Sequence, residues 1–186
     1  MKIKDFKQPI LMLAPMEGIT NRYFRDEICK YSGVDIVATE FIRITSSKQK
    51  AKPFPTHRSP THTVPLQVQF MASDPEALRD HIVFVKDKGL LNEESLIDIN
   101  VGCPSKRVNS RGAGAALLCE PKKLKDMILK IRDIHSGTLS VKTRVGYQSD
   151  EDYPNILSML KDCPLDFISI HARTKQDGYH LSLIHI

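Results

Sequence analysis

The sequence predicts an α/β protein in which strands of a buried parallel sheet alternate with amphipathic helices. Short apolar runs recur along the chain, and most are continuously apolar, as in strands that are covered on both faces. Stretches with helical spacing lie between them. The runs begin at residues 10, 35, 64, 96, 139 and 167, a repeat of about 31 residues per strand–helix unit. Six units fit a doubly wound sheet or part of an eight-unit barrel of about 250 residues.

The expected elements follow from local signals. The strands are Ile10–Ala14, Asp35–Thr39, Val64–Phe70, Leu96–Asn100, Leu139–Thr143 and Phe167–His171. The helices run from about 21 to 31, from 75 to Gly89, from 121 to Gly137 and from about 150 to 161. Asp74 and Pro75 form an N-cap followed by a first-turn proline, and glycines end three of the helices.

Composition limits the class of protein. With 41% apolar and 26% charged residues, the chain is neither disordered, collagen-like nor a coiled coil. The apolar run Pro9–Met16 is shorter than the roughly 20 residues that cross a bilayer, and no signal peptide is recognisable. The four cysteines are widely spaced without a CxxC pair, as in reduced, metal-free proteins. We therefore expect a cytoplasmic protein with no membrane span and no metal site.

The charge distribution predicts a nucleic-acid partner. The chain has 27 basic and 22 acidic residues, a formal net charge of +5. Residues 41–73 contain five basic residues and no acidic one, and residues 103–119 contain three and none. Both segments follow predicted strand ends, where they can face a phosphate backbone. The alternative for the first segment is an ordinary solvated loop.

Side chains that can carry chemistry also follow the strand ends, where parallel α/β folds place their sites. Cys103 follows a glycine and precedes a proline, a setting for a positioned thiol, although most cysteines are small buried hydrophobes. We expect Lys106, Arg107 and Arg111 to lower its pKa or to hold an anion.

Five more polar residues belong to these strands. Lys142 lies in an apolar strand, where it needs an anion, an electron-rich ring or a salt bridge. His171 ends the last strand, either as a functional group or as a satisfied strand-end histidine. One of Gln67 and Gln69 should point inward, where an amide can pair with a heterocycle, and Asn100 offers the same pairing.

Four segments resemble the successive signatures of a known family. They are Leu13–Thr20, Asp98–Lys106, Val141–Gly146 and His171–Thr174. The family is that of the tRNA-dihydrouridine synthases, which are FMN-dependent TIM-barrel enzymes with a helical C-terminal domain. The resemblance runs from about residue 9 to residue 180, and its block Asn-Val-Gly-Cys-Pro-Ser-Lys is highly specific. Thr39–Arg43 and Arg173–Tyr179 resemble the bacterial branch that modifies a D-loop uridine.

The resemblance implies a cofactor and a reaction. FMN would contact Pro15, Met16, Glu17, Gln67, Lys142 and His171. NADPH would reduce the flavin, a hydride would go to C6 of a uracil flipped out of the tRNA, and Cys103 would donate a proton to C5. Asn100 would hold the uracil or its ribose. We assign further tRNA contacts to Arg43, Lys106, Arg107, Arg144 and Arg173.

The chain differs from the family pattern at its end. In the family, loops after strands 7 and 8 grip the FMN phosphate, whereas six units fit here. We therefore expect residues 1–180 to form a (β/α)8 barrel truncated after about six units, without the helical domain and poorly active by itself. Residues 181–186 resemble translated sequencing adapter, which predicts a non-native tail. The full-length protein is expected to be a monomer.

Two other functions fit parts of the sequence. One is a flavin barrel that acts on a free pyrimidine, such as a dihydroorotate dehydrogenase. The basic segments argue against it, because a small substrate needs no such surface. The other is a non-catalytic RNA-binding fragment, against which Cys103, Lys142 and Gln67 argue.

Overall fold

The fold is a curled parallel sheet with helices packed along its outer face. The computed structural model describes residues 9–31, 33–45 and 63–179. The strands are β1 (Met12–Leu13), β2 (Ile36–Ala38), β3 (Ile42–Ile44), β4 (Leu66–Ala72), β5 (Leu96–Val101), β6 (Leu139–Gly146) and β7 (Phe167–Thr174). Every strand pair is parallel.

The order of the strands identifies the sheet as part of a TIM barrel. Neighbours follow the chain in the order β1-β2-β4-β5-β6-β7. A doubly wound sheet reverses its strand order at a switch point, and this sheet does not. The six predicted strands are confirmed, although β1 is shorter than expected and β6 and β7 are longer.

The strand β3 was not predicted. Arg43 belongs to the basic segment 41–73 that was expected to follow a strand end, but it lies within β3, which pairs with Phe70–Ala72 at the end of β4. The strand β2 pairs with Leu66 and Gln67 at the start of β4. The two short strands therefore occupy one place in the barrel order, and the chain bends between them.

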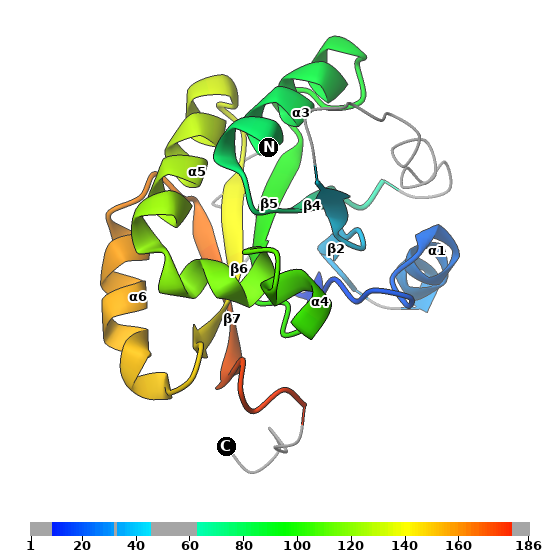
Figure 1. Ribbon diagram of the computed structural model, residues 1–186. Helices are drawn as coiled ribbons and strands as arrows, with labels where there is room; N and C mark the ends of the chain where they lie inside the picture. The colour runs from blue at the N-terminus through cyan, green and yellow to red at the C-terminus, as the bar shows by residue number, and fades with distance from the viewer. Residues whose placement is uncertain (1–8, 32, 46–62, 180–186) are drawn as a thin grey trace.

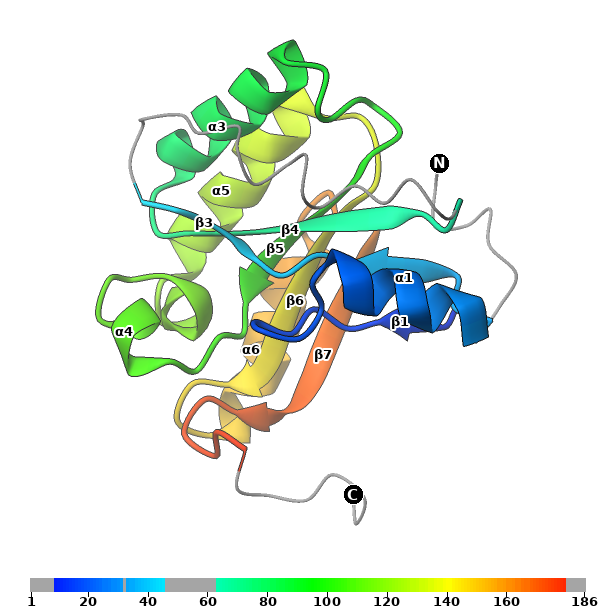
Figure 2. The same ribbon diagram turned by 90° about the vertical axis from the view of Figure 1, so that its right-hand side faces the viewer.

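The helices are α1 (Arg22–Tyr31), α3 (Pro75–Asp87), α4 (Lys106–Asn109), α5 (Pro121–Ile134) and α6 (Tyr153–Lys161), with 3-10 turns η2 (Gly114–Cys119) and η3 (Asp150–Asp152). The four predicted helices are confirmed, whereas α4 and η2 were not expected. Asp74 caps α3 by accepting a hydrogen bond from the backbone of Glu76 at 3.0 Å. Figures 1 and 2 show α3, α5 and α6 together over one face of the sheet, with α1 beside β1 and β2.

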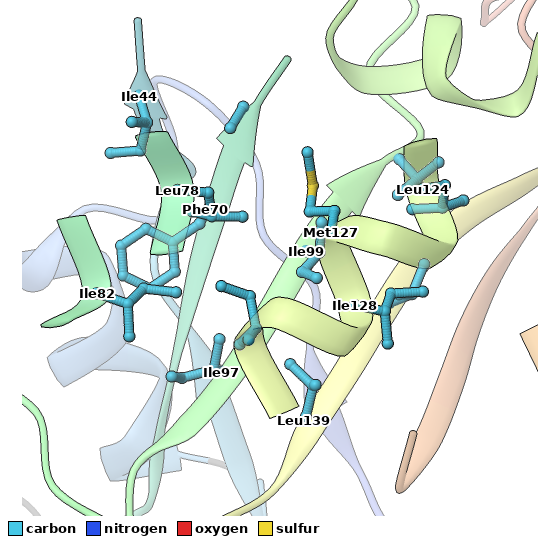
Figure 3. Close-up of a cluster of buried hydrophobic side chains, with 14 of the residues drawn as sticks. Ile44, Phe70, Leu78, Ile82, Ile97, Ile99, Leu124, Met127, Ile128 and Leu139 are labelled. Atoms are coloured by element: carbon cyan, nitrogen blue, oxygen red, sulfur yellow. The ribbon is translucent and has the colours of Figure 1, made fainter. Parts of the chain in front are cut away.

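The main core lies between the sheet and these helices. Figure 3 shows strand residues such as Phe70 and Ile99 pointing at Leu78 of α3 and Met127 of α5. The opposite face of the strands carries polar side chains, which are also buried. The strands β4 and β5 thus alternate between an apolar outer face and a polar inner face, and this inner face leads to the site.

Some sequence predictions concern residues that the structure does not describe. The boundary at residue 180, the tail 181–186 and the basic residues between 46 and 62 lie outside the described ranges. In the described part of the chain, no helix has the length and apolarity needed to cross a membrane.

We predict that the face of α5 turned to the sheet carries the stability of this layer. Leu124 is fully buried, whereas Leu129 on the same helix is 41% exposed. The change Leu124→Ala should lower the free energy of unfolding by about 3 kcal/mol, because it removes buried methyl groups and leaves a cavity. Urea titration followed by circular dichroism measures this loss. The matched variant Leu129→Ala should change stability far less, and equal losses would contradict the assignment of this face.

Candidate active site

A pocket of about 510 Å³ lies where the carboxyl ends of β5, β6 and β7 meet the loop after β1. It brings together eight of the residues that the sequence selected: Pro15, Met16, Glu17, Asn100, Cys103, Lys142, Arg144 and His171. Ile19, Phe41 and Tyr179 line it as well and were not predicted. Its volume is in the range of small-molecule and cofactor sites.

The backbone around Cys103 is held from several sides. The Asn100 Oδ1 accepts hydrogen bonds from the amides of Gly102 at 3.1 Å and Cys103 at 3.0 Å. The Asn109 Nδ2 donates to the Cys103 carbonyl at 2.8 Å. Gly114 has a φ of +62°, and a Cβ there would lie 2.9 Å from the Cys103 Cβ. This close approach requires glycine, and the loop therefore has one well-defined position.

The environment of Cys103 favours the protonated thiol. Burial raises its pKa most strongly and Glu17 acts in the same direction, whereas a hydrogen bond from the Ser105 backbone and the charges of Arg144 and Arg43 act in the opposite direction. The prediction that Lys106 and Arg107 lower this pKa is wrong, because both side chains are exposed on α4. A protonated thiol is suited to donate a proton and poorly suited to act as a nucleophile.

Lys142 lies on the inner face of β6, in register with Asn100 of β5 and Ser169 of β7. Burial lowers its pKa, and the charge of Asp98 partly offsets this effect. Within the described residues, its ammonium makes no hydrogen bond and no close ion pair. The group is therefore available to a ligand in the pocket.

His171 is in register with Arg144, one layer nearer the mouth of the barrel. Partial burial, with the charges of Arg144, Lys142 and Arg173, lowers its pKa to about 4. The imidazole is therefore neutral near pH 7. Its Nε2 lies 3.3 Å from Arg173 Nη1. Because a guanidinium only donates, Nε2 accepts this hydrogen bond and the proton sits on Nδ1.

Arg144 joins two loops instead of facing solvent. Its Nε donates to the Gly102 carbonyl at 2.7 Å, and its Nη1 donates to the carbonyls of Thr174 at 2.8 Å and Gly178 at 3.1 Å. The guanidinium lies 5.5 Å from the centre of the Tyr179 ring. With these contacts and 1% exposure, Arg144 links the Cys103 loop to the turn after β7. The sequence assigned it to tRNA, whereas these donors are already occupied.

Gln67 does not reach the pocket. Gln67 and Gln69 are two residues apart on one strand and so share a face, and the expectation that only one points inward is wrong. The Gln67 Nε2 donates to Ser140 Oγ at 2.8 Å, deeper in the barrel. The Gln69 amide instead contacts Asn100 at 2.9 Å and Asp98 at 2.6 Å.

Asp98 and Tyr179 were not predicted, and Gln67 was selected in preference to Gln69. A signal existed for Gln69 and Asp98, because each stands two residues from a selected residue, Gln67 and Asn100 respectively, and therefore on the same face. Tyr179 lies beyond the last strand, and only the folded turn brings its ring to the pocket, 6.3 Å from the ring of His171.

The remaining basic residues surround the pocket without forming one cluster. Lys106 lines a second cavity of about 440 Å³ with Ser105 and Lys175, and Pro104 and Tyr179 line both cavities. Arg107 is exposed on α4, Arg43 is half-buried in β3, and Arg173 lies beside His171. No group of three or more metal-binding side chains occurs among the residues that the structure describes.

Comparison with known proteins finds a family match over residues 12–185, to the dihydrouridine synthases. A tRNA-dihydrouridine(16) synthase of Pseudomonas syringae pv. tomato is 34% identical over 178 residues, covering 91% of this chain and 55% of that protein. The Vibrio vulnificus protein of the same name is 30% identical, covering 94% and 56%. The tRNA-dihydrouridine synthase B of Vibrio parahaemolyticus is 31% identical, covering 96% and 55%. The chain thus spans about half the length of these curated relatives.

We predict that Arg144 contributes strongly to stability. The change Arg144→Met should lower the free energy of unfolding by about 3 kcal/mol, because three carbonyls lose a buried charged donor. Urea titration measures this loss. Arg107→Met, on exposed α4, is the matched control and should leave the midpoint unchanged. A similar midpoint for both variants would show that the link between the two loops carries no stability.

We also predict a pH-dependent contribution from His171. The unfolded chain takes up a proton near the ordinary pKa of 6.5, whereas the folded chain does so only near 4. The free energy of unfolding should therefore fall as the pH is lowered from 6.5 towards 4.

Asp98 acts in the opposite sense, because burial raises its pKa to about 6. The test is therefore the difference in stability between wild type and His171→Gln, which both retain Asp98, measured by urea titration across this pH range. A difference that does not vary with pH would contradict the prediction.

Proposed function

The chain belongs to the dihydrouridine synthase family, and we propose that it forms the uridine- and flavin-binding part of a tRNA-dihydrouridine synthase. In this reaction the C5–C6 double bond of a tRNA uridine is reduced, with FMN as cofactor and NADPH as the electron donor. The observation that carries the proposal is the pocket, where three groups face one space: a protonated thiol from the loop after β5, a lysine from β6 without a hydrogen bond or close ion pair among the described residues, and a neutral histidine from β7.

The residues of the pocket fit a flavin. Pro15, Met16 and Glu17 line the pocket from the loop after β1, and Lys142 and His171 line it from β6 and β7. When bound, FMN supplies the hydride that uracil C6 accepts. The Lys142 ammonium, which makes no hydrogen bond among the described residues, suits a ring that becomes negatively charged on reduction, which gives a reason for burying a lysine there. His171, neutral near pH 7, adds no further charge.

Cys103 is proposed as the proton donor. Addition of a hydride to C6 leaves negative charge at C5 and the neighbouring carbonyl, and the Cys103 S–H transfers its proton to C5, which completes the saturated bond. Burial keeps the thiol protonated until this step. Gly114 and Asn109, which fix the loop, hold the sulfur at the edge of the pocket.

The tRNA would approach over the mouth of the pocket. A stacked base cannot be reached from both faces, so the uridine has to be flipped out of its stack. Asn100 has one N–H left for the uracil or ribose, because Oδ1 and the other N–H are already used within the protein. We propose Lys106, Arg107, Arg43 and Arg173 as contacts for the RNA backbone. Uridine 16, named in several relatives, is the first position to test.

We predict that Cys103→Ala slows dihydrouridine formation about 100-fold or more, the usual contribution of a general acid. The assay uses protein loaded with FMN, NADPH and unmodified tRNA, with dihydrouridine measured by mass spectrometry of the digested RNA. Flavin reduction by NADPH, followed by loss of visible absorbance, should keep its rate.

The matched control is Cys119→Ala, since Cys119 is exposed and outside the pocket. Wild-type protein that binds no flavin would refute the cofactor assignment. An unchanged rate of dihydrouridine formation in Cys103→Ala would refute the role of the thiol.

A further inference from the structure

Asp98 is a buried carboxylic acid that does not line the pocket. It lies in the middle of β5 and is 1% exposed. Both of its oxygens accept hydrogen bonds, one from Ser140 Oγ at 2.5 Å and the other from Gln69 Nε2 at 2.6 Å. Burying a carboxyl group is unfavourable, and this position therefore calls for a physical explanation.

A directed series of hydrogen bonds connects Asp98 with the Cys103 loop. The amides of Gly102 and Cys103 donate to Asn100 Oδ1, Asn100 Nδ2 donates to Gln69 Oε1 at 2.9 Å, and Gln69 Nε2 donates to Asp98. The side chains belong to β4 and β5, where Gln69 and Asp98 are in register.

Each orientation in the series follows from the one before. A peptide N–H can only donate, so Asn100 has to turn its oxygen towards the loop. Its nitrogen then faces Gln69, which has to present its oxygen. The Gln69 amide nitrogen then faces position 98, where only a hydrogen-bond acceptor can pair with its N–H group.

A second series of hydrogen bonds ends at the other carboxylate oxygen of Asp98. The Gln67 Nε2 donates to Ser140 Oγ, which directs the hydroxyl proton towards Asp98. Asp98 and Ser140 are in register on β5 and β6. An ionised carboxylate is the one side chain that accepts on both sides and donates on neither.

We propose that Asp98 and Gln69 are positioning residues, which set the orientation of the Asn100 amide and through it the place of Cys103 in the pocket. The consequence for catalysis rests on the proposed function, because a displaced thiol delivers its proton poorly. The positioning itself is a property of this chain with or without that reaction.

Variants that interrupt the first series should release the loop. In Gln69→Met, which keeps the length of the side chain, Asn100 loses its acceptor and its amide can rotate away from the loop. In Asp98→Leu, Gln69 loses the group that orients it. In both variants we expect Cys103 to react with iodoacetamide about tenfold faster, the effect expected for loss of a buried hydrogen bond.

Two further variants separate positioning from a general loss of stability. Asp98→Asn can still accept from Gln69 while its nitrogen donates to Ser140, and it should react at the wild-type rate. Ser140→Ala removes a hydrogen bond from the same carboxylate on the side that leads away from Cys103. It should lose stability in urea and leave the reactivity of Cys103 unchanged.

The experiment measures alkylation of each cysteine by peptide mass spectrometry, with exposed Cys119 as the internal reference. The rate of dihydrouridine formation in the FMN-loaded protein is the second readout, and it should fall about tenfold in Gln69→Met and stay at the wild-type rate in Ser140→Ala, which keeps the Asp98 charge. If Asp98→Leu does not fold, Gln69→Met and Asp98→Asn carry the comparison.

The positioning proposal is overturned if Gln69→Met alkylates within twofold of wild type, or if Ser140→Ala accelerates alkylation as much as Gln69→Met does. Wild-type protein that forms no dihydrouridine, combined with the expected alkylation pattern, would refute the proposed function and leave the positioning role intact.

Discussion

The inner face of the sheet carries buried polar side chains, and each of their N–H and O–H groups needs an acceptor, because burial separates them from bulk solvent. Parallel register brings Gln69, Asp98 and Ser140 side by side on three strands. Asp98 accepts hydrogen bonds from both neighbours. The orientation of the Gln69 and Asn100 side-chain amides follows from this single acceptor. A polar layer therefore supports the floor of the pocket, where most cores have packed hydrocarbon.

The same requirement operates at the mouth of the barrel. Loops that leave the strand ends expose carbonyls that need donors, and Arg144 supplies donors to three of them. This contact holds the turn after β7 against the loop after β5, and the aromatic ring of Tyr179 lies next to the guanidinium. Two segments more than 70 residues apart in the chain thus form one wall of the pocket.

Burial then determines the protonation states in the site. It raises the pKa of Cys103 and lowers that of Lys142, and with neighbouring cations it keeps His171 neutral. The lowered pKa values disfavour positive charge on Lys142 and His171, and the raised pKa favours the protonated thiol of Cys103. The result is a pocket with a protonated thiol and with a lysine that makes no hydrogen bond or close ion pair among the described residues.

The sequence by itself determined the strand–helix repeat, the helix ends, the family and the choice of Cys103, Lys142 and His171 as candidate residues, which the structure brings to one pocket. These depend on local spacing and on short segments of specific residues, which are readable without a fold. It did not reveal β3, the role of Gln69, the carbonyl contacts of Arg144 or the raised pKa of Cys103. Each of these depends on register between strands or on burial by distant residues, and only the tertiary structure decides which groups become neighbours and which lose contact with water.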